Sequence, residues 1–584
     1  MAEEKTWEYK HIDAFTKGLN LSVRGDKIED GELLQANNVV FEEDRIRIDT
    51  GYIPFFEAIR GAPRAVYQLF KRSGTSELLL VTNSTLYKAQ LDQWQYVKGT
   101  AGTTTTAQLN ASGTNLTVTS ITGFSNGDFI GVTLDNGLQH KTTINGAPSG
   151  TTIVMADPVP IGRTVLNGAS VIKAVILNGS FDLAISLVTL PFNDWFVFTN
   201  GVDNPKRYNG TDCVDVPNLP SAGNVQCRVV ALFQNYLLLI NTIEGGTALP
   251  QRIRWCDTAD PTNWTTGNAG FKDMYNSEDF LVAAALLGPY MILYKERGII
   301  RMEYVGSSEK LFHFEPTVSG EGTFSQDGVI DLGDYHVVVG NANIYNYSGA
   351  YTLEPVGDKI WSRMFGVRGE LNPEFKHRSF GFYVEELDEI WIFFPAGTSQ
   401  FPNKMVRWRQ EFDAWSDRNF NRDMVGYGFY LATTARPWSG LVGNWLQQVW
   451  KWNAVSVLAN SPITLLCNST NQVYSYDYVE PLDNGLPINY SFETKDFTNP
   501  QFFLRTDEIR FRAKGSNILV EYSFDKGQSW KTLGTANKGS GASYEETQLN
   551  FQALTKRVRF RLSGTSGGMA FEWFTLKYSV ESEH

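Results

Sequence analysis

The sequence has few cysteines, few histidines and no long apolar run, and each shortage excludes a class of protein. Four cysteines in 584 residues show no CxxC spacing. This predicts a reducing folding compartment, without a disulfide framework or a structural zinc site. No histidine lies within metal-ligand spacing of another histidine or of a cysteine, so a histidine metal centre has no support. These residues are Cys213, Cys227, Cys256 and Cys467, and His11, His140, His313, His336, His377 and His584.

Long hydrophobic segments are also missing. The longest apolar stretch, Phe280–Tyr294, is interrupted by Gly288-Pro289 and is shorter than the ~20 residues that a membrane span needs. We interpret it as two buried strands joined by a turn, and expect no membrane insertion. Half of the residues in Met1–Lys10 are charged, so this segment is not predicted to be a secretory signal.

The chain has fewer basic than acidic residues: 51 Lys and Arg and 63 Asp and Glu, which gives a net charge of −12. Tight nucleic-acid binding rests on phosphate neutralisation, so the surface as a whole is not expected to bind DNA or RNA. Three local basic blocks remain, at 510–514, at 556–561 and at 404–409 around Trp408. Their alternation predicts outward-facing charges on strands, and a nucleic-acid groove is the alternative.

The sequence is rich in residue patterns typical of β-strands and turns. Short runs rich in Val, Ile, Thr, Tyr, Phe and Trp alternate with Gly, Asn, Asp and Ser clusters, and helical periodicity is scarce. The 52 glycines and 22 prolines suit many tight turns. The pattern predicts an all-β protein.

Seven weak internal repeats organise the chain. Each has an apolar strand, a polar turn and a second strand rich in aromatic residues, and most are spaced by forty to sixty residues, close to the ~40–50 of a four-stranded propeller blade. Depending on how the terminal strands close the circle, they predict a β-propeller of six, seven or eight blades. The repeats are 78–89, 195–210, 236–256, 290–304, 336–349, 390–410 and 464–477.

Two segments fall outside the repeats. Residues 101–174 begin with a threonine-rich run and have almost no bulky aromatics, which predicts a small β-domain inserted in a blade loop. Residues 482–584 have longer alternating strands, which indicate a C-terminal β-sandwich. We therefore expect an N-terminal arm and first blade in 1–100, the insertion in 101–174, the rest of the propeller in 175–481 and the sandwich in 482–584.

The sequence offers no catalytic signature. A P-loop and an HExxH motif are both missing, so we predict no enzyme activity, no catalytic residue and no cofactor. A glycosidase needs only two carboxylates brought together by the fold, and one acidic run supplies candidates. We interpret that run as solvated charges in a hairpin turn; it comprises Glu385, Glu386, Asp388 and Glu389.

One short motif has a known structural meaning. Ser523–Trp530 reads SFDKGQSW and fits the Asp-box spacing of sialidase-like propellers. We expect a hairpin in which Asp525 accepts hydrogen bonds from turn amides, Gly527 takes a positive φ and Trp530 anchors the turn. The box occurs once, outside the repeats, so it does not indicate an exosialidase.

The opening passage contains a recognisable order of motifs: Gly18–Asn20, Ile28–Glu32, Ala36–Val39, Arg45–Arg47 and Gly51-Tyr52. It resembles the start of tail structural proteins of tailed bacteriophages, as do Phe198–Gly210 and Arg252–Trp264 further on. The inserted passage Ile121–Gly150 also looks like a small β-module of such proteins. The order YMILYKERGIIRMEY, SGEGTFSQDGVIDLGDYHVVVGNANIYNYSG and DEIRFRAKGSNILVEYSFDKGQSW is similar to the tail hub, or nozzle, of short-tailed phages, the packaged-DNA stabilisation proteins.

The resemblance implies a structural virion protein, made in the host cytoplasm and located in the tail. It implies a hexameric ring below the portal and its adaptor, surrounding the DNA exit channel and helping to retain and release the genome. Implied partners are tail adaptor proteins, tail fibre, spike or needle proteins, and double-stranded DNA in transit. The main alternative is a virion propeller that binds or degrades glycans as a receptor-binding tail protein, favoured by the many aromatic side chains that could stack on sugars.

Overall fold

The computed structural model describes residues 7–275, 277–307, 310–431, 462–477, 482–536, 543–565 and 568–581. The protein is all-β, as predicted: helix α1 (Trp361–Met364) is a single turn, and the body is made of strands. In the described part of the chain, no helix has the length and apolarity needed to cross a membrane.

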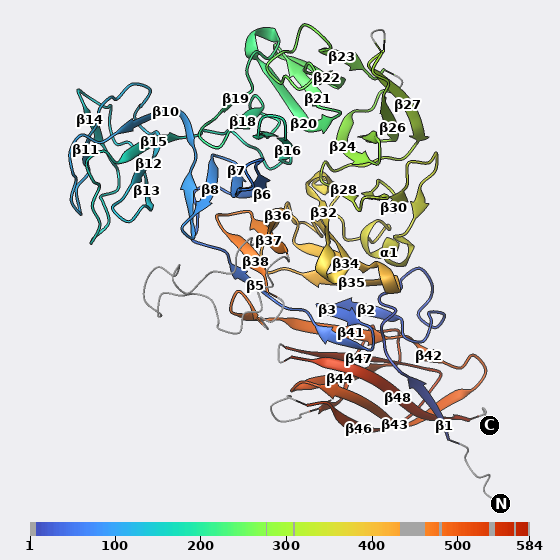
Figure 1. Cartoon of the computed structure of the whole chain (residues 1–584). Helices are drawn as coiled ribbons and strands as arrows, with labels where there is room; N and C mark the ends of the chain where they lie inside the picture. The colour runs from blue at the N-terminus through green and yellow to red at the C-terminus, as the bar shows by residue number, and fades with distance from the viewer. Residues whose placement is uncertain are drawn as a thin grey trace, which may run out of the picture.

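Seven antiparallel meanders of four strands dominate the architecture, and Figure 1 shows them following one another around a ring. They are consistent with the blades of a propeller. The first three, in chain order, are β6 (Pro63–Phe70), β7 (Ser76–Thr82), β8 (Leu86–Gln90) and β9 (Gln93–Tyr96); β16 (Ser186–Leu190), β17 (Trp195–Thr199), β18 (Lys206–Tyr208) and β19 (Cys213–Asp215); and β20 (Val225–Phe233), β21 (Tyr236–Glu244), β22 (Thr247–Trp255) and β23 (Gly270–Asp273). The fourth and fifth are β24 (Leu281–Leu287), β25 (Tyr290–Lys295), β26 (Gly298–Tyr304) and β27 (Phe312–Ser319); and β28 (Val329–Asp331), β29 (His336–Val339), β30 (Ile344–Tyr347) and β31 (Glu354–Pro355). The sixth is β32 (Phe380–Val384), β33 (Glu389–Phe394), β34 (Lys404–Arg409) and β35 (Ala414–Asn419), and the seventh is β36 (Met424–Leu431), β37 (Pro462–Asn468) and β38 (Val473–Tyr476) with β5 (Tyr52–Pro54).

The seven sequence repeats coincide with the second and third strands of these seven sheets. The apolar stretch 280–294 is likewise a hairpin of β24 and β25 with its turn at Gly288-Pro289, so that prediction is confirmed. Tryptophans that follow the repeats, Trp94, Trp264 and Trp415, are buried. They pack between strands, as expected of a core.

The first strands of neighbouring sheets lie against one another around the ring. The Gln68 side chain bonds the backbone of Leu431, joining β6 to β36, and Tyr67 of β6 bonds Thr189 of β16 at 2.7 Å. On the other side of β36, the rings of Phe382 and Tyr427 stack 4.6 Å apart. Tyr52–Pro54 of β5 pairs with β38, so an N-terminal strand completes the last sheet.

The predicted insertion forms sheets of its own. β10 (Lys98–Thr104), β15 (Ser170–Ala174), β12 (Phe129–Thr133) and β13 (Gln139–Thr143) make one sheet, and β11 (Asn115–Thr117) pairs with β14 (Thr152–Val154). Its apolar side chains form a separate cluster around Ile130 and Ile153. Figure 1 shows this unit projecting from the side of the ring.

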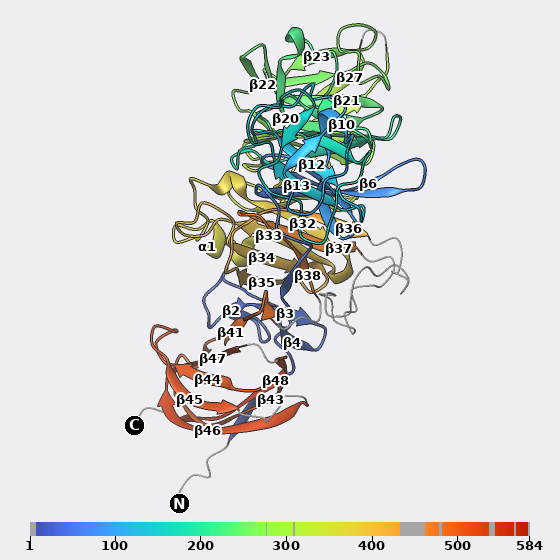
Figure 2. The ribbon, with the colours of Figure 1, turned by 90° about the vertical axis from the view of Figure 1, so that its left-hand side faces the viewer.

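Two facing sheets lie below the ring (Figure 2). One contains β1 (Glu8–Ile12), β3 (Val39–Glu42), β4 (Arg45–Ile48), β43 (Phe503–Lys514), β46 (Glu545–Thr555) and β48 (Ala570–Glu581). The other contains β2 (Leu33–Asn37), β41 (Asn489–Thr494), β42 (Phe497–Thr498), β44 (Ile518–Ser523), β45 (Lys531–Ala536) and β47 (Arg557–Thr565), and β2 joins it to β35. A short pair, β39 (Leu482–Asp483) and β40 (Leu486–Pro487), precedes them.

The N-terminal strands therefore belong to these terminal sheets, and the expected unit of an N-terminal arm and first blade in 1–100 is divided between the two parts of the fold. β1 and β4 both pair with β48, and β2 pairs with β41. Pairings that span more than 450 residues leave no local signature, so the sequence could not show them.

The Asp-box hairpin has the geometry that the sequence predicts. Asp525 accepts a hydrogen bond from the Ser529 amide at 2.9 Å, and Gly527 has a φ of +81°. The indole of Trp530 lies 4.2 Å from the Arg561 guanidinium, which holds the hairpin against β47. The hydrogen bonds hold the pKa of Asp525 well below its usual range.

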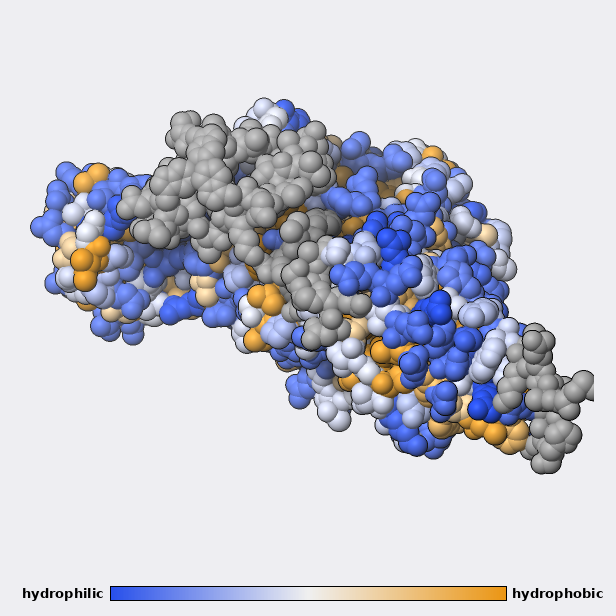
Figure 3. Space-filling model, turned by 90° about the horizontal axis from the view of Figure 1, so that it is seen from below, coloured by the Kyte–Doolittle hydropathy of each residue, from blue (hydrophilic) through white to orange (hydrophobic). Residues whose placement is uncertain are grey.

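Apolar side chains on the underside of the molecule form small separate patches among hydrophilic ones (Figure 3). Small scattered patches of this kind are ordinary for a folded surface. The visible surface of this face therefore gives no reason to assign a membrane or a broad hydrophobic partner to it.

The insertion offers a direct test of modularity, because its first and last strands are paired and its ends lie together at Lys98 and Ala174. Replacing 101–172 by a short Gly-Ser linker is expected to leave the rest of the chain folded, since exposed loop insertions are separable units. Circular dichroism and thermal unfolding of the shortened chain measure this. Aggregation or loss of the main unfolding transition would contradict it.

Candidate functional site

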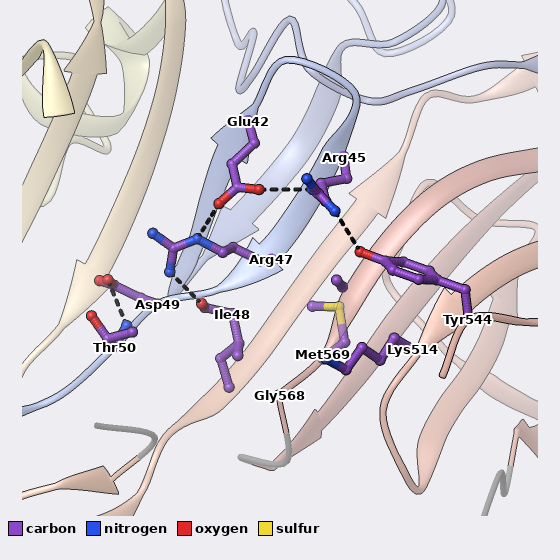
Figure 4. Close-up of a pocket in the computed structure, with 11 residues that line it drawn as sticks. Glu42, Arg45, Arg47, Ile48, Asp49, Thr50, Lys514, Tyr544, Gly568 and Met569 are labelled. Atoms are coloured by element: carbon purple, nitrogen blue, oxygen red, sulfur yellow. Dashed lines mark hydrogen bonds and ion pairs between the residues drawn. The ribbon is translucent and has the colours of Figure 1, made fainter. Parts of the chain in front are cut away.

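One cleft lies where the ring of sheets meets the terminal sheets, with a volume of about 240 Å³. Figure 4 shows Glu42 between two arginines, with Arg45 reaching across to the Tyr544 hydroxyl at 3.0 Å. Lys514 also lines it. The Arg45–Arg47 motif of the opening passage thus faces this cleft.

Behind the cleft, three arginines and three carboxylates form a buried ion network. Arg407 and Arg418 both bond Asp49, with Nη2–Oδ2 and Nη1–Oδ2 distances of 2.8 and 2.5 Å. Arg407 also pairs with Glu389 at 3.1 Å. Asp483 is shared by Arg422 at 2.6 Å and Arg418 at 3.9 Å. The charges balance, as buried ions require.

Asp49 is the centre of this network. It is 1% exposed, and its other oxygen accepts hydrogen bonds from the Tyr476 hydroxyl at 3.0 Å and the Thr50 amide at 2.8 Å. Burial alone would raise the pKa of Asp49, but Arg407 and Arg418 outweigh it and hold the pKa well below its usual range. One carboxylate thereby ties the β4–β5 connection to β34, β35 and β38.

Close packing explains the residues that follow Asp49. A Cβ on Gly51 would lie 1.8 Å from the Leu482 carbonyl oxygen, so only glycine fits there. Tyr52 is fully buried, and the Arg418 guanidinium lies 4.8 Å from its ring. The Gly51-Tyr52 motif is therefore a structural part of this junction.

The interpretation of the 385–389 run as solvated turn charges is wrong for Glu389. Residues 385–388 do make the turn, but Glu389 begins β33 and is 1% exposed. It accepts a hydrogen bond from the Trp391 indole at 2.8 Å as well as pairing with Arg407. Burial raises the pKa of Glu389, and Arg407 offsets only part of that.

The block around Trp408 also differs from the expectation of charges on an outer face. Arg407 is 3% exposed inside the network, and Lys404 is buried against Glu370. Only Arg409 is partly exposed, and it donates to the Phe41 carbonyl at 2.6 Å. Five of the six residues of β34 are buried, so both faces of this strand are covered.

The two C-terminal basic blocks are outward-facing, as the alternation predicts. Strand β47 alternates between partly exposed and buried positions. Their cations are also paired: Arg559 with Glu493 and Asp496, and Arg561 with Glu521. Arg510 and Arg512 likewise pair with Glu508 and Glu572. Neutralised side chains are poor phosphate ligands, which disfavours a nucleic-acid groove here.

The described residues contain no group of three or more His, Cys, Asp or Glu that could hold a metal ion. The four cysteines are unpaired and buried, and burial raises the pKa of Cys213, Cys227, Cys256 and Cys467. Such thiols are poor nucleophiles. His336 is buried between the Tyr294 hydroxyl and the Leu286 carbonyl.

The arrangement suits mechanical coupling better than chemistry. Asp49 and Glu389 have pKa values shifted in opposite directions, as an acid–base pair has. However, Arg407 joins both carboxylates, and Glu389 is not among the residues that line the cleft. A glycosidase needs its two carboxyl groups on either side of a bound sugar.

Asp49, Arg418 and Asp483 carry no signal in the sequence, because their partners lie from 61 to 369 positions away and ion pairs at such separations leave no local pattern. Arg407 was weakly indicated as unusual, because the basic block at 404–409 interrupts an apolar repeat. Later motifs of the resemblance are also structural: the Asn200 side chain accepts hydrogen bonds from the amides of Val202 and Asp203, and Arg252 pairs with Asp273 at 2.7 Å.

No protein-family model and no curated protein matches the chain. Distant solved structures are β-propeller proteins. PorZ of Porphyromonas gingivalis is 8% identical with a TM-score of 0.32, covering 82% of this chain and 46% of PorZ. An exo-β-1,3-galactanase of Phanerochaete chrysosporium is 8% identical with a TM-score of 0.23, covering 97% and 100%. BBS1N, from its complex with ARL6DN, is 10% identical with a TM-score of 0.28, covering 64% and 97%. Likeness at this level carries no functional argument.

The raised pKa of Glu389 gives a prediction. A carboxyl whose folded pKa exceeds its unfolded value loses stability as pH rises through the folded pKa. Glu389→Gln keeps an acceptor for the Trp391 indole and removes this loss. The free energy of unfolding of the variant, relative to that of the wild type at the same pH, is therefore expected to rise from pH 4 to pH 7.5. Urea unfolding at both pH values measures it. A larger relative deficit at pH 7.5 than at pH 4 would contradict the sign.

Proposed function

We propose that this chain is a structural protein of a short-tailed phage tail, a nozzle or hub subunit. In this proposal the seven sheets are a seven-bladed propeller, residues 101–174 are an inserted β-domain and the terminal sheets are a sandwich. Six copies form a ring below the portal and its adaptor, around the DNA exit channel. The basis is the order of motifs in the sequence, with which the fold is compatible.

The junction between the propeller and the sandwich is the structural feature that fits this proposal best. A load-bearing ring subunit must pass force between its parts without hinging. Here β2 joins β35 to the terminal sheets, and the Asp49 network buries six charged groups at the same place. Breaking such a network costs several kcal/mol. In this proposal the two parts act as one rigid body.

The acidic net charge fits a channel through which DNA must pass. Each chain carries −12, and a hexamer carries six times that charge. An acidic lumen would repel phosphates at short range, so that the duplex does not adhere during ejection. The pairing of the C-terminal arginines with carboxylates removes the most obvious adhesive patch.

Sedimentation of the purified full-length chain, alone and with its tail adaptor, tests the proposal. The expected species has a mass of about 390 kDa, six times the 65.5 kDa chain. A DNA-binding titration at low salt is expected to show no tight complex with the ring. A chain that stays monomeric with and without the adaptor would contradict the proposal.

The glycan alternative keeps one specific observation in its favour, the Asp49 and Glu389 pair with oppositely shifted pKa values. If the chain were a glycosidase, Glu389→Gln would abolish reducing-sugar release from host polysaccharide. The structural proposal predicts no release from the wild type or the variant.

A further inference from the structure

The turn between β39 and β40 carries an exposed Asn-Gly pair. Asn484-Gly485 joins the two strands, which among the described strands pair only with each other. Both residues have a positive φ, +51° and +80°, as a type I′ hairpin turn requires. Both are exposed, and so are the residues of β40 that follow them. Water therefore has access to the Asn484 side chain.

An asparagine followed by glycine can modify itself without an enzyme. The glycine backbone nitrogen attacks the side-chain carbonyl carbon, and the amide nitrogen leaves as ammonia with the proton of the attacking N–H. The five-membered succinimide that remains is opened by water at one of its two carbonyls, which gives aspartate or isoaspartate. Glycine favours the reaction because it has no Cβ to obstruct ring closure. The step requires a glycine nitrogen that is free to approach the side chain.

The sequence contains seven other Asn-Gly pairs, and each is held by a contact that Asn484-Gly485 lacks. Neither the Gly485 N–H nor the Asn484 side chain has a hydrogen bond to another described residue. The Asn209 side-chain oxygen, in contrast, accepts hydrogen bonds from the amides of Thr211 and Asp212, both at 2.9 Å. In the other six pairs the glycine N–H itself donates: Gly127 to Ile144 O at 2.9 Å, Gly137 to Leu134 O at 3.0 Å, Gly146 to Asn126 Oδ1 at 2.8 Å, Gly168 to Thr105 O at 2.9 Å, Gly179 to Asn83 O at 2.8 Å and Gly201 to Thr199 Oγ1 at 3.1 Å.

The β39–β40 hairpin is also weakly held as a whole. Its pairing comprises two residues on each strand, and Leu486 of β40 is 52% exposed. An isolated two-stranded hairpin is marginally stable in water, so local opening costs little free energy and lets the Gly485 nitrogen reach the side chain. The Asn136-Gly137 turn, by comparison, joins β12 and β13 within a four-stranded sheet.

The turn adjoins the Asp49 network at the junction of the ring with the terminal sheets. Asp483, 4% exposed, accepts the Arg422 hydrogen bond at 2.6 Å, and the Asn484 amide donates to the Tyr52 carbonyl at 2.8 Å. Either product places a new negative charge next to Asp483. Isoaspartate also adds one methylene to the main chain, which breaks the pairing of Asp483 with Leu486.

We propose that Asn484 is the site at which the folded chain modifies itself, by deamidation with water as the co-reactant. The change weakens the junction beside Asp483 as the protein ages. This inference is independent of the phage-tail proposal, since it concerns the chemistry of a single chain.

Peptide mapping by mass spectrometry tests the site, with the full-length chain incubated at pH 8.5 and 37 °C. Asn484 is expected to be converted about tenfold faster than any of the other seven asparagines, because each of those must first lose a hydrogen bond. In guanidinium chloride, where the turns are unfolded, all eight are expected to react at similar rates. Similar rates at all eight sites in the folded chain would overturn the proposal.

Matched variants test the link to the junction. Asn484→Gly keeps a residue that tolerates positive φ and cannot deamidate, so its melting temperature is expected to stay constant during the incubation. The wild type and Asn136→Gly are expected to lose melting temperature in step with the modified fraction of Asn484. The unincubated variants control for any effect of the substitutions on folding. An equal change in the wild type and in Asn484→Gly would overturn the link.

Discussion

Replacing Asp49 by asparagine is expected to destabilise the protein by about 3–5 kcal/mol, the cost of removing one partner from a buried ion network. The change leaves Arg407 and Arg418 facing each other with no shared carboxylate. It also weakens the acceptor of the Tyr476 hydroxyl. Urea unfolding followed by tryptophan fluorescence at pH 7.5 measures the loss.

A matched control is Asp44→Asn. Asp44 also pairs with an arginine, Arg45 at 3.2 Å, but its side chain is 67% exposed. Exposed pairs contribute about 0–1 kcal/mol, so this variant is expected to behave like the wild type. Equal effects at Asp44 and Asp49 would mean that the network does not hold the junction together.

The pH dependence of the Asp49 effect has a definite sign. Because the folded pKa of Asp49 is depressed, its contribution is present above the unfolded pKa and is lost as pH falls through the folded one. The gap between wild type and Asp49→Asn is therefore expected to be constant near neutrality and to narrow below about pH 4, the usual pKa of Asp.

Gly426→Ala is the second variant with a large expected effect. A Cβ at Gly426 of β36 would lie 1.7 Å from the Arg64 carbonyl oxygen of β6. Because backbone cannot yield as a side chain can, β36 must move away from β6 and open the ring of first strands. We expect a loss of about 3 kcal/mol or more, at the upper end of overpacking costs.

The control is Gly102→Ala in β10, where the added Cβ would meet only the flexible end of the Lys98 side chain. Its effect is expected to stay within about 0.5 kcal/mol. Thermal and urea unfolding of both variants make the comparison. A Gly426→Ala protein as stable as the Gly102→Ala protein would contradict the close packing of β6 against β36.

Local sequence patterns predict much of the fold. Alternation and turn residues predict the hairpins, and the repeats mark the second and third strands of all seven sheets, because each hairpin is encoded within about twenty residues. The Asp box succeeds for the same reason: Asp525 bonds an amide four residues away.

Long-range pairing is where sequence reasoning fails. β1 and β4 join β48 across the whole chain, and Asp49 finds its arginines more than 350 positions away. Alternation also misplaces Arg407, since it assumes that one face of a strand meets water, and the turn interpretation misplaces Glu389, which already belongs to β33. Strands β33 and β34 are covered on both faces, so charges there are buried and paired.

Electron microscopy of the purified full-length chain, with class averages viewed down the symmetry axis, tests the central claim most directly. The account predicts a six-fold ring with a central opening, formed by the chain itself or on addition of the tail adaptor. Isolated single subunits under both conditions, together with cleavage of a host glycan by the same preparation, would contradict it.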